Sequence, residues 1–442
     1  MERQAARESA ARTYARHLPV APSHAEGAVI TGVDGRRYLD CLSGAGTLAL
    51  GHNHQAVVAA LRATLDRGAP LHTLDMITPE KDAFTSELLG VLPGDLRNAA
   101  RVHFCGPSGA DAVEAALKLA RLATGRRGVV AFSGAYHGMT MGATAVSGGD
   151  RMRTVGTTDG VAVSRLPFPY EYRCPFGVGS GLSGRLSAQL TENLLDDPYG
   201  GVGHPAAMIL EVVQGEGGVI PADDDWLRAM RRITEARGIL LVIDEVQTGV
   251  GRTGGFWACE QAGVTPDVLV MSKAIGGGLP LAVIGYRPDL DVWSAGDHTG
   301  TFRGNTLAMV AGQVTLRTVV EEELPQRATR MGERLRAGLD ELVAAHPFLG
   351  DARGRGLMLG VEVVDPHAEL DRVGARPADP VRARALRAAC LDAGLIVELG
   401  GRRDAVLRLL PPLVITEREC DQVLERLGDA CASCSTSSGP GA

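Results

Sequence analysis

Short runs of aliphatic and β-branched residues alternate with long Ala- and Leu-rich stretches between residues 56 and 310. The short runs predict buried strands, and the longer stretches have the spacing of polar and apolar residues that is typical of helices. This alternation predicts βαβ units, in which a mostly parallel sheet is covered on both faces. We therefore expect a large α/β domain, with its clearest strands at 101–105, 128–132, 207–211, 239–244 and 268–272.

The pattern changes on both sides of this region. Residues 32–40 place Gly and Asp between two short apolar runs, which predicts a hairpin. Helical stretches at 324–346 and 380–393 flank an apolar run at 357–363, which indicates a smaller α+β domain. We expect four regions: an N-terminal segment that contributes to the small domain (1–55), the large domain (56–325), the C-terminal small domain (326–430) and a disordered Ser- and Gly-rich tail (431–442).

Composition narrows the class of protein. With 45% hydrophobic and 22% charged residues, the chain of 442 residues lies in the globular range. A formal net charge of −7 leaves no broad basic surface, so a nucleic-acid partner is not expected. No apolar run approaches the ~20 residues of a membrane span, and the N-terminus lacks the apolar core of a secretory signal. We expect a cytoplasmic protein without a membrane partner.

The eight cysteines show one paired spacing, Cys431-x-x-Cys434, which lies in the tail without neighbouring histidines. We therefore expect free thiols and no metal site. Lysine is rarer still, because the chain contains only Lys81, Lys118 and Lys273.

Two charged residues stand at the ends of predicted strands. Asp244 ends the run 239–244, and Lys273 follows the run 268–272. Because loops at the carboxyl ends of parallel strands gather into one crevice, both side chains should face a shared ligand site. A lone Asp or Lys at a strand end more often has a structural role than a catalytic one. Because the chain has only three lysines, a lysine at a strand end together with the Asp favours a catalytic role.

Pyridoxal phosphate chemistry requires such a pair. It needs a lysine amine, a carboxylate beside the pyridine nitrogen, an aromatic ring and amides that hold the phosphate. Residues 106–111 (GPSGAD) separate a predicted strand from a helix and place amide groups at a helix N-terminus, where a phosphate is favoured. Tyr136 follows another strand end and supplies the aromatic ring, while the neighbouring His137 is expected to be a packing residue.

In this order the motifs resemble the class III (ω-amino acid) aminotransferases of pyridoxal phosphate fold type I, from about residue 20 to 428. The matching stretches are Asp34 to Asp40, GPSGADAVEAALKLAR, YHGMT, LEVVQGEGGV, LVIDEVQTGVGRTG, SKAIGGGLP, GTFRGNTLA and LRLLPPL. By this resemblance Lys273 forms the Schiff base with the cofactor and Asp244 pairs with its ring nitrogen. Gln247 is implied to hydrogen-bond the cofactor's 3-hydroxyl.

The resemblance also implies how the rest of the cofactor is held. Tyr136 would stack on the ring, and Ser108, Gly109 and Ala110 would bind the phosphate. Thr301 would reach the phosphate of a neighbouring subunit, which implies a homodimer with the active site at the subunit interface.

Glu216 and Arg408 resemble the family's gate. Arg408 would bind the α-carboxylate of glutamate or 2-oxoglutarate, and Glu216 would neutralise Arg408 when an ω-amino donor is bound. A site that serves two half-reactions needs such a switch, because an unpaired buried guanidinium is costly. A structural ion pair, or no pair, is the alternative.

The stretches YHGMT and HTGTFRGN are most similar to the branch of the family that aminates L-aspartate 4-semialdehyde with L-glutamate, giving L-2,4-diaminobutyrate. Met139 supports this, because the 4-aminobutyrate and ornithine branches usually place a carboxylate-binding Arg there. Three alternatives stay open: another ω-amino acid transaminase (4-aminobutyrate, ornithine, lysine or β-alanine), an aminomutase or racemase on the same scaffold, or a binding protein without cofactor.

Overall fold

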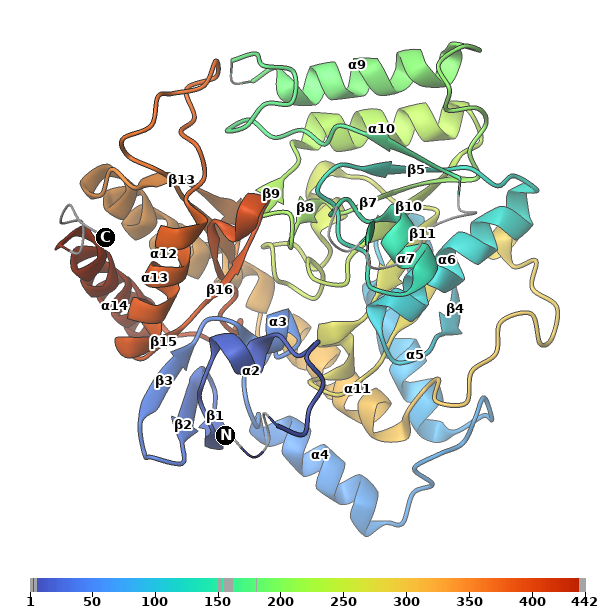
Figure 1. Ribbon diagram of the computed structural model, residues 1–442. Helices are drawn as coiled ribbons and strands as arrows, with labels where there is room; N and C mark the ends of the chain where they lie inside the picture. The colour runs from blue at the N-terminus through green and yellow to red at the C-terminus, as the bar shows by residue number, and fades with distance from the viewer. Residues whose placement is uncertain (1–2, 4–5, 150–152, 155–161, 180, 437–442) are drawn as a thin grey trace.

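The computed structural model describes residues 3, 6–149, 153–154, 162–179 and 181–436 (Figure 1). A seven-stranded sheet in the order β4-β12-β11-β10-β7-β5-β6 forms the centre of its larger part. Its neighbours pair in parallel, except that β12 is antiparallel to both β4 and β11. This confirms the predicted mostly parallel sheet. Its strands are β4 (Arg101–Phe104), β5 (Val129–Phe132), β6 (Val163–Leu166), β7 (Ala207–Leu210), β10 (Leu240–Asp244), β11 (Val268–Met271) and β12 (Val283–Tyr286).

Both faces of this sheet are buried, as the strand β10 shows. Leu241 and Ile243 belong to the apolar cluster that contains Trp226 of α10 (Asp224–Ala236), whereas Leu240 and Val242 belong to the cluster of α6 (Gly109–Thr124). Successive side chains of a strand point to opposite faces, so every position of β10 needs an apolar residue. The continuous apolar runs in the sequence therefore reflect burial on two sides.

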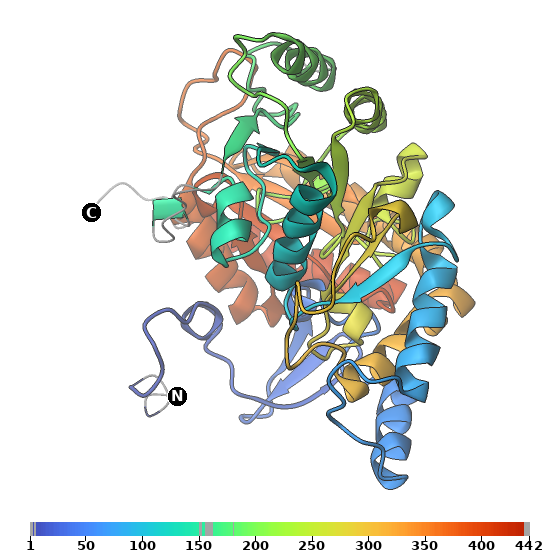
Figure 2. The ribbon, with the colours of Figure 1, turned by 90° about the vertical axis from the view of Figure 1, so that its right-hand side faces the viewer.

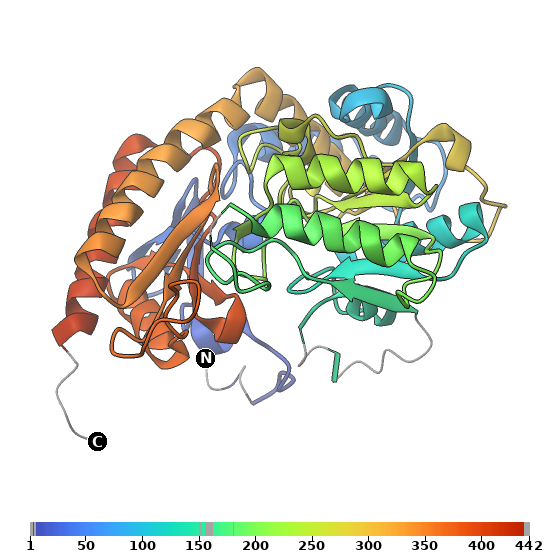
Figure 3. The same cartoon turned by 90° about the horizontal axis from the view of Figure 1, so that it is seen from above.

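Helices cover the sheet on both faces. Helix α9 (Ser183–Asp196) lies beside α10 on one side, as Figures 1 and 3 show. Helix α6 packs on β11 and β12 on the other side. The further helices of this part are α4 (Gln55–Asp66), α5 (Pro79–Val91), α7 (Met141–Val146) and α11 (Thr306–Glu321).

A second part of the molecule is built on smaller sheets and lies beside the first, as seen from above (Figure 3). One sheet has the order β13-β14-β17-β16 and another the order β1-β2-β3-β15, in which β3 pairs in parallel with β15. The N-terminal segment therefore shares a sheet with the C-terminal region. The strands are β1 (Pro22–Glu26), β2 (Val29–Gly32), β3 (Arg37–Asp40), β13 (Leu349–Arg355), β14 (Met358–Val363), β15 (Leu395–Ile396), β16 (Glu398–Gly400) and β17 (Val406–Leu409).

Several elements of this second part lie where the sequence predicted them. Strands β2 and β3 form the expected antiparallel hairpin. The predicted helices are α12 (Leu324–Ala345) and α13 (Pro380–Asp392), and β14 is the predicted strand between them. The remaining elements are α2 (Tyr14–His17), which lies in the N-terminal segment at the edge of the molecule in Figure 2, α3 (Ser43–Gly46) and the pair β8 (Val213–Gln214) and β9 (Ile220–Pro221). The domain boundaries stay a prediction.

The predicted disordered tail is wrong for its first six residues. Helix α14 (Glu417–Thr436) continues through them, and residues 437–442 lie outside the described residues. Cys431 and Cys434 explain the difference, because both thiols are buried against the rest of the small sheets and helices and anchor this last part of the helix. All eight cysteines are free and buried. None of the helices in the described ranges has the length and apolar character to span a bilayer.

Candidate active site

A cavity of about 460 Å³ lies at the carboxyl ends of the large sheet's strands. Segments that follow five different strands line it: Ser108–Ala110 after β4, residues 136–140 after β5, Glu211 after β7, Asp244 with Gln247 at the end of β10, and Lys273 after β11. The structure thus brings together the strand ends that the sequence placed at one crevice. Glu216 also lines the cavity.

Lys273 reaches this cavity from a strained turn. Its φ of 51° lies in the left-handed region, which is costly for a residue with a side chain and is common at functional sites. Within the described ranges, its Nζ has no hydrogen-bond partner. Burial lowers the pKa of Lys273, while the carboxylates of Glu216 and Asp244 act in the opposite direction. Burial therefore shifts the balance towards the neutral amine, which is the nucleophilic form.

Asp244 is held by a histidine from another strand end. Its Oδ2 lies 2.8 Å from His137 Nδ1, and its Oδ1 accepts a hydrogen bond from the Val246 amide at 3.0 Å. Burial opposes the charged imidazole, but the hydrogen bond and charge of Asp244 outweigh it and raise the pKa of His137. His137 was expected to be a packing residue; instead it forms a buried charged pair with the candidate catalytic carboxylate.

Glu211 ties two loops of the cavity together. Its Oε1 accepts from the Tyr136 amide at 2.9 Å, and its Oε2 accepts from the Gly215 amide at 3.0 Å. Burial raises the pKa of Glu211 to about 7. Because Gly215 begins the turn that carries Glu216, this one carboxyl group connects the loop of the candidate stacking ring to the loop of the candidate gate.

The start of α6 offers unpaired amides to the cavity. Ser108 is its N-cap, with Oγ accepting from the Asp111 amide at 3.3 Å and donating to Asp111 Oδ2 at 2.6 Å. The amides of Gly109 and Ala110 come next, where a helix has no internal partners for them. Because the Ser108 hydroxyl already serves Asp111, an anion at this site would meet mainly the two amides and the positive end of the helix.

Small residues leave room at this helix start. A side chain at Gly138, whose φ is +126°, would place its Cβ 2.5 Å from Ala110 Cβ. A Cβ on Gly109 would lie 3.0 Å from a methyl group of Val246. Glycine at 138 therefore lets the loop after β5 approach the helix start, and glycine at 109 does the same for the segment after β10.

Gln247 is fixed by the N-terminal segment. Its Nε2 donates to the carbonyl of Ala45 at 3.1 Å, and Ala45 itself has a left-handed φ of 58°. The turn at residues 43–46 thus belongs to the wall of the site. This orients the Gln247 amide so that its oxygen faces away from Ala45.

Glu216 and Arg408 form a bidentate ion pair beside the cavity. Arg408 Nη1 lies 2.7 Å from Glu216 Oε1, and Nη2 lies 3.1 Å from Oε2. Arg408 is 2% exposed, whereas the Glu216 side chain is 33% exposed. The guanidinium is therefore desolvated, and its carboxylate partner is the more accessible of the two to solvent.

Thr301 does not reach this cavity. It is exposed, on the loop before α11, and its neighbour Phe302 is 68% exposed. Of the predicted site residues, Thr301 alone lies away from the group, which agrees with the expected contact to a second subunit without testing it.

The donor set fits pyridoxal phosphate. A free lysine amine, a buried carboxylate held by an imidazole, an aromatic ring and a helix start with open amides line one cavity. The glycine at 138 is needed for this shape, since a side chain would fill the space beside Ala110. In the described part of the chain, no cluster of His, Cys, Asp and Glu could hold a metal ion.

Solved structures show which class this fold and site define. An amine transaminase from an uncultivated Pseudomonas species, determined in its PLP-bound form, is 29% identical, with a TM-score of 0.84 over 96% of this chain and 97% of that one. An (S)-enantioselective ω-transaminase from Thermomicrobium roseum is 28% identical, with a TM-score of 0.85 over 97% and 96%. The fold is that of the pyridoxal phosphate-dependent enzymes of fold type I.

The family follows from sequence comparison. Residues 10–431 match the family Aminotransferase class-III, and the chain belongs to it. A diaminobutyrate–2-oxoglutarate aminotransferase of Rhizobium meliloti is 54% identical over 98% of this chain and 93% of its own length. One of the same name from Haemophilus influenzae is 47% identical over 96% and 93%. The protein is thus a pyridoxal phosphate-dependent aminotransferase, and the predicted class of enzyme and cofactor are confirmed.

Two residues of the site were missed by sequence reasoning. Glu211 and His137 act by contacts with segments far along the chain, and no local spacing announces such contacts. The available signal was position, since Glu211 ends a predicted strand and His137 directly follows the candidate aromatic ring.

Proposed function

We propose that this aminotransferase moves an amino group from L-glutamate to L-aspartate 4-semialdehyde, giving L-2,4-diaminobutyrate and 2-oxoglutarate by a ping-pong mechanism. The observation that carries the proposal is the Glu216–Arg408 pair beside the cavity that holds Lys273. The choice of substrates is supported by the names of the relatives from R. meliloti and H. influenzae.

Pyridoxal phosphate, when bound, supplies a ring that withdraws electrons from the substrate carbon next to nitrogen. Lys273 would hold the cofactor covalently and, once released by the substrate amine, would move a proton at that carbon through its neutral Nζ. Asp244 would keep the ring nitrogen protonated, and Gln247 would orient the cofactor's 3-hydroxyl. Tyr136 would cover one face of the ring.

The phosphate would be held at the start of α6 by the amides of Gly109 and Ala110, with Ser108 shaping the turn as its N-cap. These roles rest on the resemblance to the family and are supported by the shared cavity. Thr301 of a second subunit would complete the phosphate site.

The gate would distinguish the two half-reactions. L-Glutamate reacts through its α-amine, so its α-carboxylate lies near the reacting carbon and can replace Glu216 on Arg408. L-2,4-Diaminobutyrate reacts through its 4-amine, which has no carboxylate beside it. In that half-reaction Glu216 would stay on Arg408 and remove the cost of a buried unpaired guanidinium.

Met139 supports this choice over 4-aminobutyrate or ornithine. Its side chain lines the cavity and is 55% exposed. A thioether offers no charge to a substrate's distal carboxylate, whereas an arginine at this place would. The site therefore does not select for ω-amino acids that depend on such a contact.

A substrate assay tests the proposal. The holoenzyme with L-glutamate and L-aspartate 4-semialdehyde should give equal amounts of 2-oxoglutarate and diaminobutyrate, with the parallel double-reciprocal lines of a ping-pong reaction. L-Glutamate alone should release 2-oxoglutarate in an amount equal to the enzyme. No release in the second assay would favour an aminomutase or racemase, and a preference for another aldehyde would contradict the proposed substrate.

We further propose a homodimer. The loop before α11 packs on residues 70–77, with Arg303 donating to Asp75 Oδ2 at 2.8 Å. Several large apolar side chains are exposed there, and a concentration of exposed apolar surface is typical of interfaces. They are Leu71, Leu74, Met76, Ile77 and Phe302. Replacing Ile77 by Glu should shift the mass in solution to that of one chain; an unchanged mass would contradict this interface. The proposal includes a cytoplasmic location, which cell fractionation tests.

A further inference from the structure

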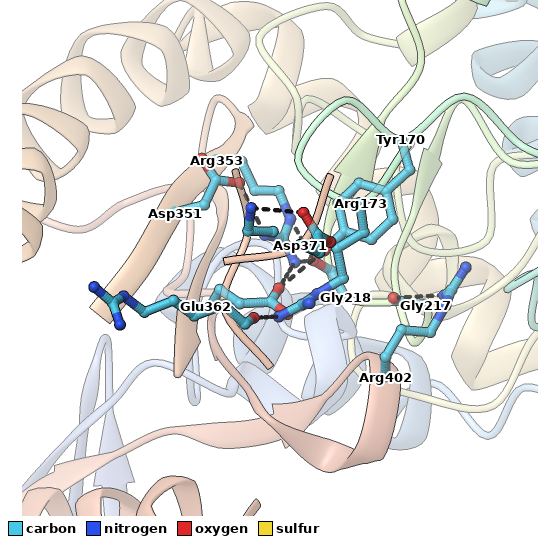
Figure 4. Close-up of polar contacts among 11 residues, drawn as sticks. Tyr170, Arg173, Gly217, Gly218, Asp351, Arg353, Glu362, Asp371 and Arg402 are labelled. Atoms are coloured by element: carbon cyan, nitrogen blue, oxygen red, sulfur yellow. Dashed lines mark hydrogen bonds and ion pairs between the residues drawn. The ribbon is translucent and has the colours of Figure 1, made fainter. Parts of the chain in front are cut away.

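The turn that carries Glu216 is bound through its main chain as well as through its carboxylate. Three successive carbonyls of the turn accept hydrogen bonds from the C-terminal part of the chain. The Gly401 amide donates to Glu216 O at 2.8 Å, and Arg402 Nη1 donates to Gly217 O at 3.1 Å. Arg353 donates to Gly218 O twice, from Nη2 at 2.7 Å and Nε at 2.9 Å (Figure 4).

The turn rests on one row of residues in the sheet β13-β14-β17-β16. In that row Arg353 lies opposite Gly360, and Gly360 lies opposite Arg408. Directly opposite residues of antiparallel strands point to the same face of a sheet, so the two arginines stand on either side of Gly360. Val219 occupies the gap, since a Cβ on Gly360 would lie 3.0 Å from Val219 Cβ.

Each arginine of the row therefore binds a different part of the same turn. Arg408 binds the carboxylate of Glu216, and Arg353 binds the main-chain oxygen two residues later. The turn also lies close against the end of β16, because a Cβ on Gly218 would meet Gly401 Cα at 3.0 Å.

A buried network fixes Arg353 in place. Glu362, which is 0% exposed, accepts from Arg353 Nη2 at 2.7 Å, from Tyr170 at 2.9 Å and from Arg173 Nε at 2.7 Å (Figure 4). The Tyr170 ring lies 5.1 Å from the guanidinium carbon of Arg353 and 5.7 Å from that of Arg402. A buried carboxylate with three charged or polar donors holds its partners rigidly.

We propose that Arg353 and Arg402 are positioning residues of the gate: they fix the backbone of the Glu216 turn on the sheet that carries Arg408, so that the gate opens by rotation of the Glu216 side chain alone. This inference rests on the proposed gate function. In the closed gate Glu216 binds Arg408, so loosening the turn should weaken this state. In the open gate the substrate carboxylate binds Arg408 instead, so this state should not be affected.

The two half-reactions provide the test, since each uses one state of the gate. In Arg402→Met the kcat/KM for L-2,4-diaminobutyrate should fall about tenfold, the order expected for a lost hydrogen bond from a charged donor. The kcat/KM for L-glutamate should stay within about twofold. The ratio of kcat/KM for L-glutamate to kcat/KM for L-2,4-diaminobutyrate should therefore rise. Arg353→Lys, which keeps the charge beside Glu362 but cannot donate twice to Gly218 O, should shift the ratio in the same direction.

Arg173→Met is the matched control. Arg173 binds the same Glu362, but its other hydrogen bond goes to the carbonyl of Arg376 rather than to the turn. This variant should lower the melting temperature without changing the ratio of the two half-reactions.

Glu216→Gln separates failure of this inference from failure of the proposed function. It should shift the ratio itself, and adding Arg402→Met to it should shift the ratio no further. If Glu216→Gln leaves the ratio unchanged, the proposed gate is wrong. If it shifts the ratio but Arg402→Met and Arg353→Lys do not, or if they slow both half-reactions equally, the positioning role alone is wrong.

Discussion

His137 Nδ1 lies 2.8 Å from Asp244 Oδ2, and both side chains are buried. The pair joins the loop after β5 to the end of β10, on the face of the sheet that α6 covers. The hydrogen bond and charge of Asp244 raise the pKa of His137, so the pair favours a charged imidazole beside the carboxylate. Both members of this pair line the cavity, so the carboxylate there has a charged partner at its own wall.

Replacing Asp244 should lower kcat more than replacing His137. Asp244→Asn removes the charge next to the cofactor ring, and kcat should fall by about 10²–10³. His137→Phe acts only through Asp244, so we expect a loss of about tenfold. Steady-state kcat with saturating substrates measures both losses. Equal losses would contradict the view that His137 acts only through Asp244.

The same pair predicts a pH dependence. The pKa of His137 is raised above 6.5, so the stabilisation from the charged pair is fully present below 6.5 and is lost as the pH rises through the raised pKa. The alkaline decline of kcat that this causes should be absent from the profile of His137→Phe. An identical alkaline decline in both proteins would assign it to another group.

Lys273→Ala should abolish covalent cofactor capture and turnover. Borohydride reduction of the wild-type holoenzyme should attach the cofactor to the peptide that contains Lys273, as detected by mass spectrometry. Lys118→Ala is the control, because the Lys118 amine donates to the Asp297 carbonyl at 2.5 Å and does not line the cavity. Attachment to Lys118 or Lys81 would disprove the assignment.

Gly138→Ala should weaken cofactor binding by about tenfold or more, because the new Cβ would lie 2.5 Å from Ala110 Cβ and push the loop away from the start of α6. Titration of the cofactor-free protein, followed by absorbance, measures this. Gly125→Ala is a matched control at the other end of α6: its φ of +67° imposes backbone strain, but its Cβ would meet nothing within 4 Å. A similar loss in both variants would mean that strain, and not the clash, is responsible.

Glu245 predicts a pH dependence of stability that is separate from catalysis. Burial raises its pKa from 4.5 to about 7, although hydrogen bonds from Thr248 and the Cys259 amide oppose the shift. Between these values the folded state holds a proton that the unfolded state has lost, so stability falls as the pH rises from about 4.5 to 7. Glu245→Gln should remove this fall. The free energy of unfolding of the variant, taken relative to that of wild type, should therefore be about 3 kcal/mol higher at pH 8 than at pH 4.5.

Chemical denaturation of wild type and Glu245→Gln across this range measures the difference. The amide oxygen can still accept from Cys259, and the Thr248 hydroxyl can accept from the amide nitrogen, so the packing should survive. A constant difference between the two proteins at all pH values would contradict a proton held by Glu245.

The sequence predicted the sheet and the positions of the chemical groups, because both depend on local patterns. Buried strands need apolar runs; Asp244 ends one of them, and Lys273 follows another. The pairing of His137 with Asp244, and of Arg353 with Gly218, could not be predicted in this way. Such contacts depend on the register and crossing of segments that are more than a hundred residues apart.

The C-terminal tail also shows that composition alone does not predict packing. Its Ser- and Gly-rich composition predicts disorder, but Cys431 and Cys434 occupy one face of a helix that packs against the small sheets and helices. Burial of two thiols outweighs the composition of the residues around them.

The three lysines also make the protein suited to chemical footprinting. Lys118 is exposed and Lys81 is partly exposed, whereas Lys273 faces the cavity. An amine-reactive reagent should therefore modify the first two at rates that do not depend on the cofactor, and modify Lys273 only when its amine is free. The ratio of labels on one intact chain would report the occupancy of the site, with the two remote lysines serving as its internal standard.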